Sequence, residues 1–290
     1  MCREVGLETK LKKLWRACFP YDPPAFIDAF FERLYPLAQC FCERADGRVV
    51  SVLYGIPAAL DGQKLLYIYA AGTHPDYRGR GLMGALLRRA HETARAEGYA
   101  AAFLKPGEDG LFDYYARFGY HPCFAQRTVN LEALRVAAPG KKVDRTAMGQ
   151  GRTPAAENTD GTSAMHTIAR IPAADYPAAR RRMLPPMSVE WPDTAALFAA
   201  HTAEMAGGMA LASAQGMALC EPMRNKVRVW ELLCMPEERA VYLAAIKAAF
   251  PNVNELEVTE VTGEERFGMV CPLREGWTPP TRAYMGLTLG

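Results

Sequence analysis

Arginine and glycine alternate in one short segment in a way that suits the binding of a phosphate group. Arg78 and Arg80 precede Gly79 and Gly81, and Gly84 follows within one helical turn. Glycine lets the backbone turn tightly and approach a ligand with no Cβ in the way. Arginine supplies positive charge and hydrogen-bond donors that match phosphate oxygens. The segment therefore predicts an anion site, and its place between a strand and a helix strengthens that prediction.

The residues on either side predict the elements that would position this segment. Leu65–Ala71 reads as an apolar strand, and Leu82, Leu86 and Ala90 recur at helical spacing up to a stop at Gly98. The first turn of a helix presents unpaired N–H groups and the positive end of the helix dipole, and both favour an anion. We therefore expect main-chain amides to hold a pyrophosphate here. The alternative is an ordinary tight turn with solvated arginines.

The segment Arg78-Gly-Arg-Gly-Leu-Met83 resembles the Arg/Gln-x-x-Gly-x-Gly/Ala signature of the GNAT superfamily of N-acetyltransferases, with Met83 at the last position. The chain is similar in particular to the tandem-domain type, the "enhanced intracellular survival" family, without that family's extra C-terminal domain. The resemblance implies acetyl-CoA as co-substrate. It also implies a set of cofactor-binding residues, in which the first three contact the acetyl-pantetheine arm and the others the pyrophosphate: Ala71, Gly72, Thr73, Arg78, Gly79, Arg80, Gly81, Leu82, Met83 and Gly84.

A second part of the resemblance lies in the segment from Gly110 to Tyr120, which is similar to the family's Tyr-x-x-x-Gly-Phe/Tyr helix end. The resemblance implies that Tyr115 is the catalytic acid that returns a proton to the CoA thiolate. A phenol with a pKa of about 10 can protonate a thiolate with a pKa of about 8.5 only when it is held at hydrogen-bond distance. The alternative is an aromatic packing residue. No general base stands out, although His74 and His121 flank these segments.

The composition of the chain limits the kinds of protein that it can be. The chain has 290 residues, half of them hydrophobic, and a net charge of +2, which gives no argument for a nucleic-acid or membrane partner. Its eight cysteines form no CxxC pair, so we expect no metal site and reduced thiols in the cytoplasm. The beginning of the sequence lacks the apolar core of a signal peptide. The sequence is compatible with a homo-oligomer and does not decide the oligomeric state.

The order of predicted elements gives the fold class. Helices over 7–19 and 24–37 precede an antiparallel meander, and the strand over 100–104 should lie parallel to Leu65–Ala71. The resemblance implies that these two parallel strands splay apart. We expect an α/β (α+β) protein with a mixed, mostly antiparallel GNAT-like sheet. The predicted domains are residues 1–135, a catalytic domain that binds acetyl-CoA; residues 136–163, a linker or surface excursion; and residues 164–290, a second GNAT-like domain.

The second domain repeats the order of helices, hairpin, strand, helix and strand, but its loop differs. The segment Cys234-Met-Pro-Glu-Glu-Arg239 has no glycine, Pro236 lacks an amide hydrogen, and Glu237 and Glu238 would repel a pyrophosphate. We therefore expect a degenerate domain without a cofactor of its own. An unrelated α+β cap is nearly as compatible with the pattern.

These expectations combine into a functional hypothesis. We expect an acyl-CoA-dependent N-acetyltransferase in which a primary amine of a small molecule or peptide attacks the thioester directly. A backbone amide of residues 71–73 would stabilise the oxyanion. A non-catalytic acyl-CoA-binding module and a transferase with a longer acyl donor are the alternatives. The identity of the acceptor, and whether the carboxylate of Gly290 reaches the site, stay open.

Overall fold

The computed structural model describes residues 6–132 and 167–289, which form two compact units. The first unit contains the chain up to Ala125 together with residues 187–198 and 266–285. The second contains the described parts of residues 126–186, 199–265 and 286–290. The predicted linker, residues 136–163, lies wholly outside the described residues, as does Gly290. In the described part of the chain, no helix has the length and apolar character needed to cross a membrane.

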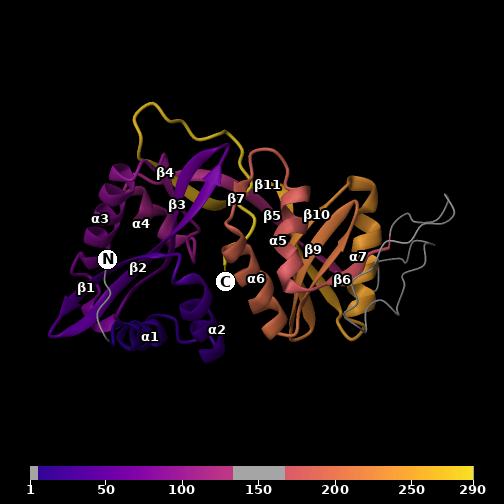
Figure 1. Cartoon of the computed structure of the whole chain (residues 1–290), viewed down its shortest axis with the longest axis horizontal. Helices are drawn as coiled ribbons and strands as arrows, with labels where there is room; N and C mark the ends of the chain where they lie inside the picture. The colour runs from indigo at the N-terminus through magenta and orange to yellow at the C-terminus, as the bar shows by residue number, and fades with distance from the viewer. Residues whose placement is uncertain (1–5, 133–166, 290) are drawn as a thin grey trace. The chain divides into compact units, whose positions relative to one another are not determined.

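The first unit is a mixed sheet with helices on both faces (Figure 1). Its strands run in the order β1-β2-β3-β4-β11, and β7 pairs with β2. The bounds of its strands are β1 Gln39–Ala45, β2 Arg48–Leu60, β3 Gln63–Thr73, β4 Ala101–Leu104, β7 Val189–Glu190 and the end of β11, which spans Glu255–Pro272. Its helices are α1 Leu7–Cys18, α2 Pro24–Ala29 with a π-helical turn Phe30–Leu34, α3 Leu82–Ala96 and α4 Gly110–Ala116.

Two tight hairpin turns set the register of the meander. Asp46 and Gly47 join β1 to β2, and Asp61 and Gly62 join β2 to β3. All four residues have positive φ, at 52°, 72°, 49° and 68°. This is the backbone of a type I′ turn, which Asp-Gly favours and which matches the twist of paired strands. Both turns stand where the sequence predicts them.

Alternate side chains of β2 and β3 lie on opposite faces of this sheet, and each face packs against different helices. Leu53, Leu66 and Ile68 lie in one apolar cluster with residues of α3 and α4. The rings of Tyr54 and Tyr69 instead contact Trp15 of α1, at centroid distances of 5.8 and 6.1 Å. Because successive side chains of a strand point to opposite faces, the two sets cannot share a side. Trp15 of α1 and Phe30 and Phe31 of the π-helical turn are therefore core residues.

The second unit has a related layout. Its strands run in the order β11-β10-β9-β8-β6, and α5 and α7 lie on opposite sides of them (Figure 1). The bounds are β6 Ala169–Ile171, α5 Tyr176–Met183, β8 Met209–Ser213, β9 Gly216–Met223, β10 Lys226–Cys234 and α7 Arg239–Ala249, and α6 Asp193–Met205 begins in the first unit and ends in this one. The pairing of β10 with β11 is parallel. This arrangement agrees with the expected second GNAT-like fold.

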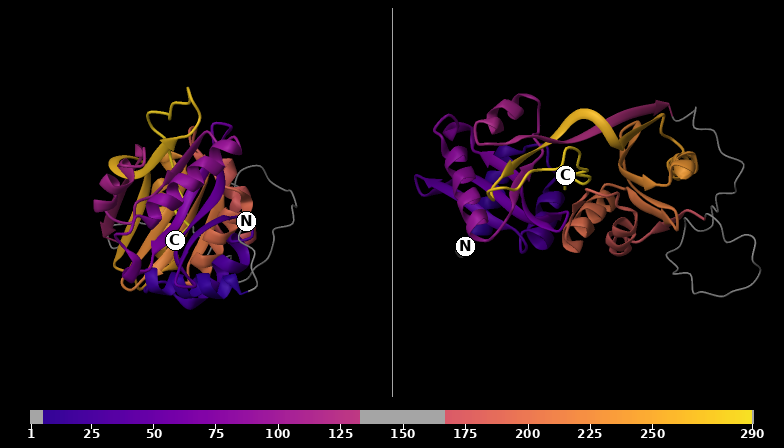
Figure 2. Two further views of the ribbon diagram at one scale, coloured as in Figure 1. Left: turned by 90° about the vertical axis from the view of Figure 1, so that its left-hand side faces the viewer. Right: turned by 90° about the horizontal axis from the view of Figure 1, so that it is seen from above.

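Two strands each contribute residues to both units. The strand β5, His121–Glu132, leaves the first unit after Ala125 and pairs with β11, and Figure 2 shows the two strands alongside each other. The strand β11 ends in the first unit, where Met269 faces Leu104 of β4 in an antiparallel register. The neighbour of β4 is β11, whose residues Met269, Val270 and Cys271 are buried there.

Candidate functional site

The glycine-rich segment forms a loop whose main-chain donors are directed away from other protein groups. It runs from the 3-10 turn Pro75–Tyr77 to the first turn of α3. Among the described residues, no acceptor receives the N–H groups of residues 79 to 84, whereas Arg78 and Ala85 at either side donate to Pro75 and Gly81. Consecutive unpaired amides at the positive end of a helix form a site for an anion.

The glycines of this loop serve different purposes. Gly79 and Gly81 each have φ of 75°, a left-handed conformation that other residues adopt only at a cost, and space is open around both. Gly84 has an ordinary helical backbone, but a Cβ there would lie 2.9 Å from the ring of Phe118. Gly79 and Gly81 therefore shape the loop, whereas Gly84 lets the helix pack closely.

The predicted arginines are held by the loop itself. Arg78 donates from Nε to the carbonyl of Thr73 at 3.2 Å. Arg80 donates to the carbonyl of Asp76 at 3.1 Å, and its guanidinium lies 4.7 Å from the ring centre of Tyr77. Tyr77 is fixed in turn, because its hydroxyl donates to Asp46 at 2.9 Å. Both arginines thus brace the loop and add positive charge around its amides.

The strand β3 breaks from its neighbours directly before the loop. Its register with β2 passes from Gly72 opposite Val52 to Tyr69 opposite Tyr54, so β3 carries an extra residue at Ala70–Ala71. Ala70 has a φ of 45°, an unusual value for a residue with a Cβ. Such a β-bulge leaves main-chain groups unpaired and redirects them. The sequence does not predict the conformation of Ala70, because alanine gives no signal for a left-handed position.

The parallel pairing between β3 and β4 ends before β3 reaches the bulge at Ala70–Ala71. It covers Leu65 to Tyr67 of β3, and Tyr67 faces Phe103. Beyond that point β3 continues to Thr73 with no further register to β4, as the expected splay requires. A Cβ on Gly72 would meet Cys18 at the end of α1 at 2.9 Å, so this glycine allows the helix to approach.

Tyr115 lies in an apolar cluster that includes residues of both β3 and β4. The cluster contains Ile68 and Leu104, and Ala71 and Met83 pack against it. The Tyr115 side chain is 8% exposed, and no described residue makes a hydrogen bond with its hydroxyl. Burial, with a smaller effect of neighbouring Tyr114, raises the pKa of Tyr115 to about 12. The phenol is therefore protonated at any physiological pH.

The other polar side chains near the loop and near α4 make contacts within the protein or are exposed to solvent. His74 caps the 3-10 turn, because its Nδ1 accepts the amide hydrogen of Asp76. His121 is exposed at the start of β5. Arg89 of α3 binds Glu43 at 2.8 Å and the carbonyl of Cys42 at 2.8 Å, so it ties the helix to β1. None of these contacts indicates a general base.

At the matching position of the second unit, helix α7 begins directly after a 3-10 turn. Pro236–Glu238 forms a 3-10 turn, and the amides of Met235 and Glu238 donate to main-chain carbonyls. The strand β10, which pairs in parallel with β11, also carries an extra residue, because its register with β9 shifts between Val229 and Glu231. Glu231 is buried there and accepts from Arg180 at 2.9 Å. In the turn before α7 two main-chain donors are therefore already paired within the protein.

Several known proteins are similar to this chain in sequence pattern or in fold. Residues 7–123 match the family described as "Acetyltransferase (GNAT) domain". A probable N-acyltransferase from Enterococcus faecalis V583 has 15% identity and a TM-score of 0.69, with 93% of this chain and 71% of that one covered. Eis1 from Mycobacterium abscessus has 14% identity and a TM-score of 0.62, with coverages of 93% and 72%. No curated protein matches the sequence at a significant level.

A tandem GNAT protein from the clavulanic acid biosynthesis pathway matches over almost its whole length. It has 15% identity and a TM-score of 0.55, and the alignment covers 94% of this chain and 97% of that one. At such identities the likeness is one of fold. This similarity of fold extends through the second unit, beyond residues 7–123 that the family model matches. It confirms the expected fold class. Residues 7–123 are thus similar to the acetyltransferase (GNAT) domain, and the whole chain is similar in fold to a tandem GNAT protein.

Proposed function

We propose that the chain transfers an acetyl group from acetyl-CoA to a primary amine. The observation that carries this proposal is the run of unpaired amides over residues 79 to 84, which follows the part of β3 that no longer pairs with β4. The family match supports acyl transfer as the class of reaction. In this proposal residues 1–135 supply the cofactor site, and residues 164–290 bind no cofactor.

The loop fits a pyrophosphate in its chemistry. Its donors have no protein partner, and the space around Gly79 and Gly81 is open. The pantetheine arm would then lie along Ala71, Gly72 and Thr73, in the gap that β4 leaves. Thr73 is held in place there by its hydroxyl contact with buried Ser51 at 2.8 Å. Leu82 and Met83 contribute amides at the start of α3.

The bulge would supply the electrostatic part of catalysis. Attack of the neutral amine forms a C–N bond and places negative charge on the thioester oxygen, which a main-chain amide of residues 71–73 would stabilise. One such donor typically accelerates acyl transfer by roughly 10²–10³-fold. Positioning the thioester against the amine contributes the remainder. The strain at Ala70 is consistent with a backbone that is fixed for this purpose.

Tyr115 would complete the proton transfers. When the C–S bond breaks, the thiolate takes the proton of the Tyr115 phenol and leaves as free CoA. The attacking nitrogen gives up one proton, which returns to the phenolate through water, so the reaction yields one amide and one thiol. Location of Tyr115 beside Ala71 and Leu104 in one cluster supports this role.

A thiol-release assay with acetyl-CoA and a panel of amines tests the proposal. The panel should contain an aminoglycoside, a polyamine and a peptide with a free N-terminus and a lysine. We expect release that depends on an amine. Binding of CoA without turnover on any amine would favour a non-catalytic acyl-CoA-binding module. Faster turnover with longer acyl donors would show that the gap accepts another acyl chain.

A further inference from the structure

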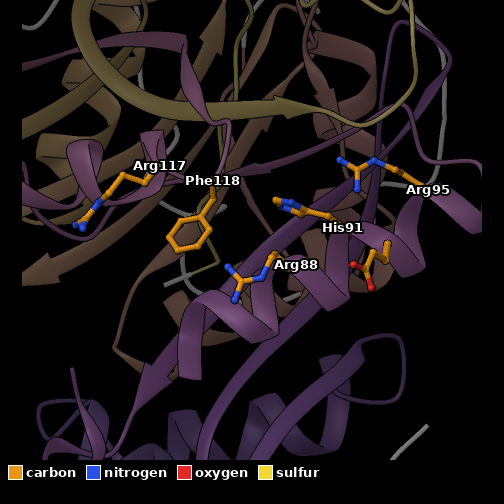
Figure 3. A pocket seen from close by; sticks show the side chains of 6 residues that line it. Arg88, His91, Arg95, Arg117 and Phe118 are labelled. Carbon is orange, nitrogen blue, oxygen red and sulfur yellow. The ribbon is translucent and has the colours of Figure 1, made fainter. Parts of the chain in front are cut away.

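A buried hydrogen bond joins α3 to the chain directly after α4. On α3, Nε2 of His91 lies 2.8 Å from the hydroxyl oxygen of Tyr120. The two side chains are 5% and 2% exposed, and their ring centres are 5.3 Å apart. Figure 3 shows the imidazole of His91 directed from α3 towards the turn that carries Phe118. The reaction proposed above uses neither side chain.

This polar pair lies against apolar surroundings. Tyr120 belongs to the apolar cluster that contains Leu86 and Leu87 of α3. Apolar side chains of similar size would pack there without the cost of removing a hydroxyl and an imidazole from water. A buried polar pair that is fully hydrogen-bonded instead fixes its neighbours in one arrangement. The pair therefore indicates a need for a precise position of the Tyr120 ring.

The main chain ties Tyr120 to Tyr115. After α4 the chain forms a Schellman motif, in which the N–H of Tyr120 donates to the carbonyl of Tyr115 at 3.4 Å and that of Gly119 donates to Ala116 at 3.1 Å. Gly119 has a φ of 85°, the left-handed conformation that this motif uses. The rings of Tyr115 and Tyr120 meet edge to face, with centres 5.8 Å apart and planes at 69°. The orientation of the Tyr115 ring thus depends on that of Tyr120.

Tyr115 needs such support, because a proton donor must be held at hydrogen-bond distance from the atom that it protonates. Its hydroxyl has no partner among the described residues, and its other ring contact is with partly buried Tyr114. The helix that carries His91 also begins with the unpaired amides of the loop. The hydrogen bond of His91 therefore connects the end of α4 to the helix that would hold the pyrophosphate.

We propose that His91 and Tyr120 are positioning residues that hold the Tyr115 phenol in place for proton transfer to the thiolate. The inference rests on the proposed function and adds two residues to its site. Neither side chain contacts the reacting atoms in this role. His91 supplies the hydrogen bond that fixes the Tyr120 ring, and that ring supplies the edge-to-face contact with Tyr115.

Steady-state kinetics of the full chain with Tyr120→Phe and with His91→Leu test this inference, because each change removes the same hydrogen bond. We expect each to lower kcat by roughly five- to tenfold, the preference that one hydrogen bond between neutral groups can impose. The KM for acetyl-CoA should stay unchanged, because the loop amides are intact. His91→Gln keeps a hydrogen-bonding group close to the position of Nε2 and should keep most of the wild-type kcat.

The matched control is Tyr242→Phe, which removes the hydrogen bond of a tyrosine hydroxyl to Ser213 in the second unit. It should keep the wild-type kcat. Urea denaturation checks that each variant is folded under the assay conditions. If either Tyr120→Phe or His91→Leu does not fold, the other supplies the test.

A double-mutant cycle with Tyr115→Phe separates positioning from a general loss of structure. Without the Tyr115 hydroxyl there is no acid to position, so Tyr120→Phe should have no further effect on kcat in that background. An equal loss of kcat in both backgrounds would overturn the inference and leave acetyl transfer standing. Wild-type kcat in both Tyr120→Phe and His91→Leu would do the same.

The outcomes also distinguish this inference from the proposed function. Absence of amine-dependent turnover in the wild type would overturn both. Turnover in the wild type, together with wild-type kcat in Tyr115→Phe, would overturn the acid role and its positioning residues and leave the transfer reaction itself.

Discussion

Tyr115→Phe separates the proposed proton donor from the packing role of the same ring. Burial raises the pKa of Tyr115 to about 12, so at pH 8 only about one molecule in 10⁴ is ionised. The acid form is therefore present throughout the working range and is lost only as the pH rises towards 12. We expect the rate of the wild type to show no alkaline decline from this residue up to pH 10.

The size of the effect depends on the thiolate that Tyr115 must protonate. A thiol in water has a pKa of about 8.5, which would make the transfer unfavourable by about 5 kcal/mol. Burial in this unit raises the pKa of the Cys18 and Cys123 thiols to about 11. A CoA thiolate buried to the same degree reduces the mismatch to about one unit, or about 1.4 kcal/mol. Donation by Tyr115 is then feasible.

We expect Tyr115→Phe to lower kcat by roughly 10²–10⁴-fold, the usual contribution of a general acid. Its thermal unfolding should be close to that of the wild type, because no described residue bonds to the hydroxyl and the ring is kept. Tyr114→Phe, on the same helix and only partly buried, is the control and should keep its activity. Wild-type kcat in Tyr115→Phe would refute the assignment.

Three further predictions concern stability and are each checked by urea denaturation. Gly84→Ala should cost about 1–3 kcal/mol, because its Cβ meets the Phe118 ring at 2.9 Å, and an unchanged midpoint would contradict this packing. Burial, with a smaller effect of a neighbouring arginine, lowers the pKa of His91 to about 4. The neutral ring therefore stabilises the fold above pH 6.5, and about 3 kcal/mol is lost as the pH falls from 6.5 to 4, whereas His91→Gln should lack this loss. Glu231→Gln removes the carboxylate that buried Arg180 binds and should cost about 3–5 kcal/mol, and a cost below about 1 kcal/mol would show that the pair is dispensable.

Local signals in the sequence predict the elements around the site well. The turns at Asp46–Gly47 and Asp61–Gly62 are confirmed because their residue types favour positive φ. The order of strand, loop and α3 is confirmed because apolar spacing and glycine stops are local features. The residue roles at the loop and at Tyr115 stay predictions.

The features that the sequence does not reveal depend on distant parts of the chain. The strand β11 runs to Pro272 and pairs with β4, although the polar residues around Gly263 resemble a turn. Non-local pairing of this kind leaves no periodic signal of its own. The strain at Ala70 is imposed by the bulge.

Titration of the full chain with CoA is the most direct test of the account, with Gly81→Val and Gly81→Asn as paired variants. The left-handed backbone at Gly81 costs an ordinary residue about 1–2 kcal/mol, whereas asparagine tolerates it better. The account predicts that the wild type binds CoA, that valine weakens binding by roughly tenfold or more, and that asparagine weakens it much less. A wild-type chain with no affinity for CoA, or a valine variant that binds as tightly as the wild type, would contradict it.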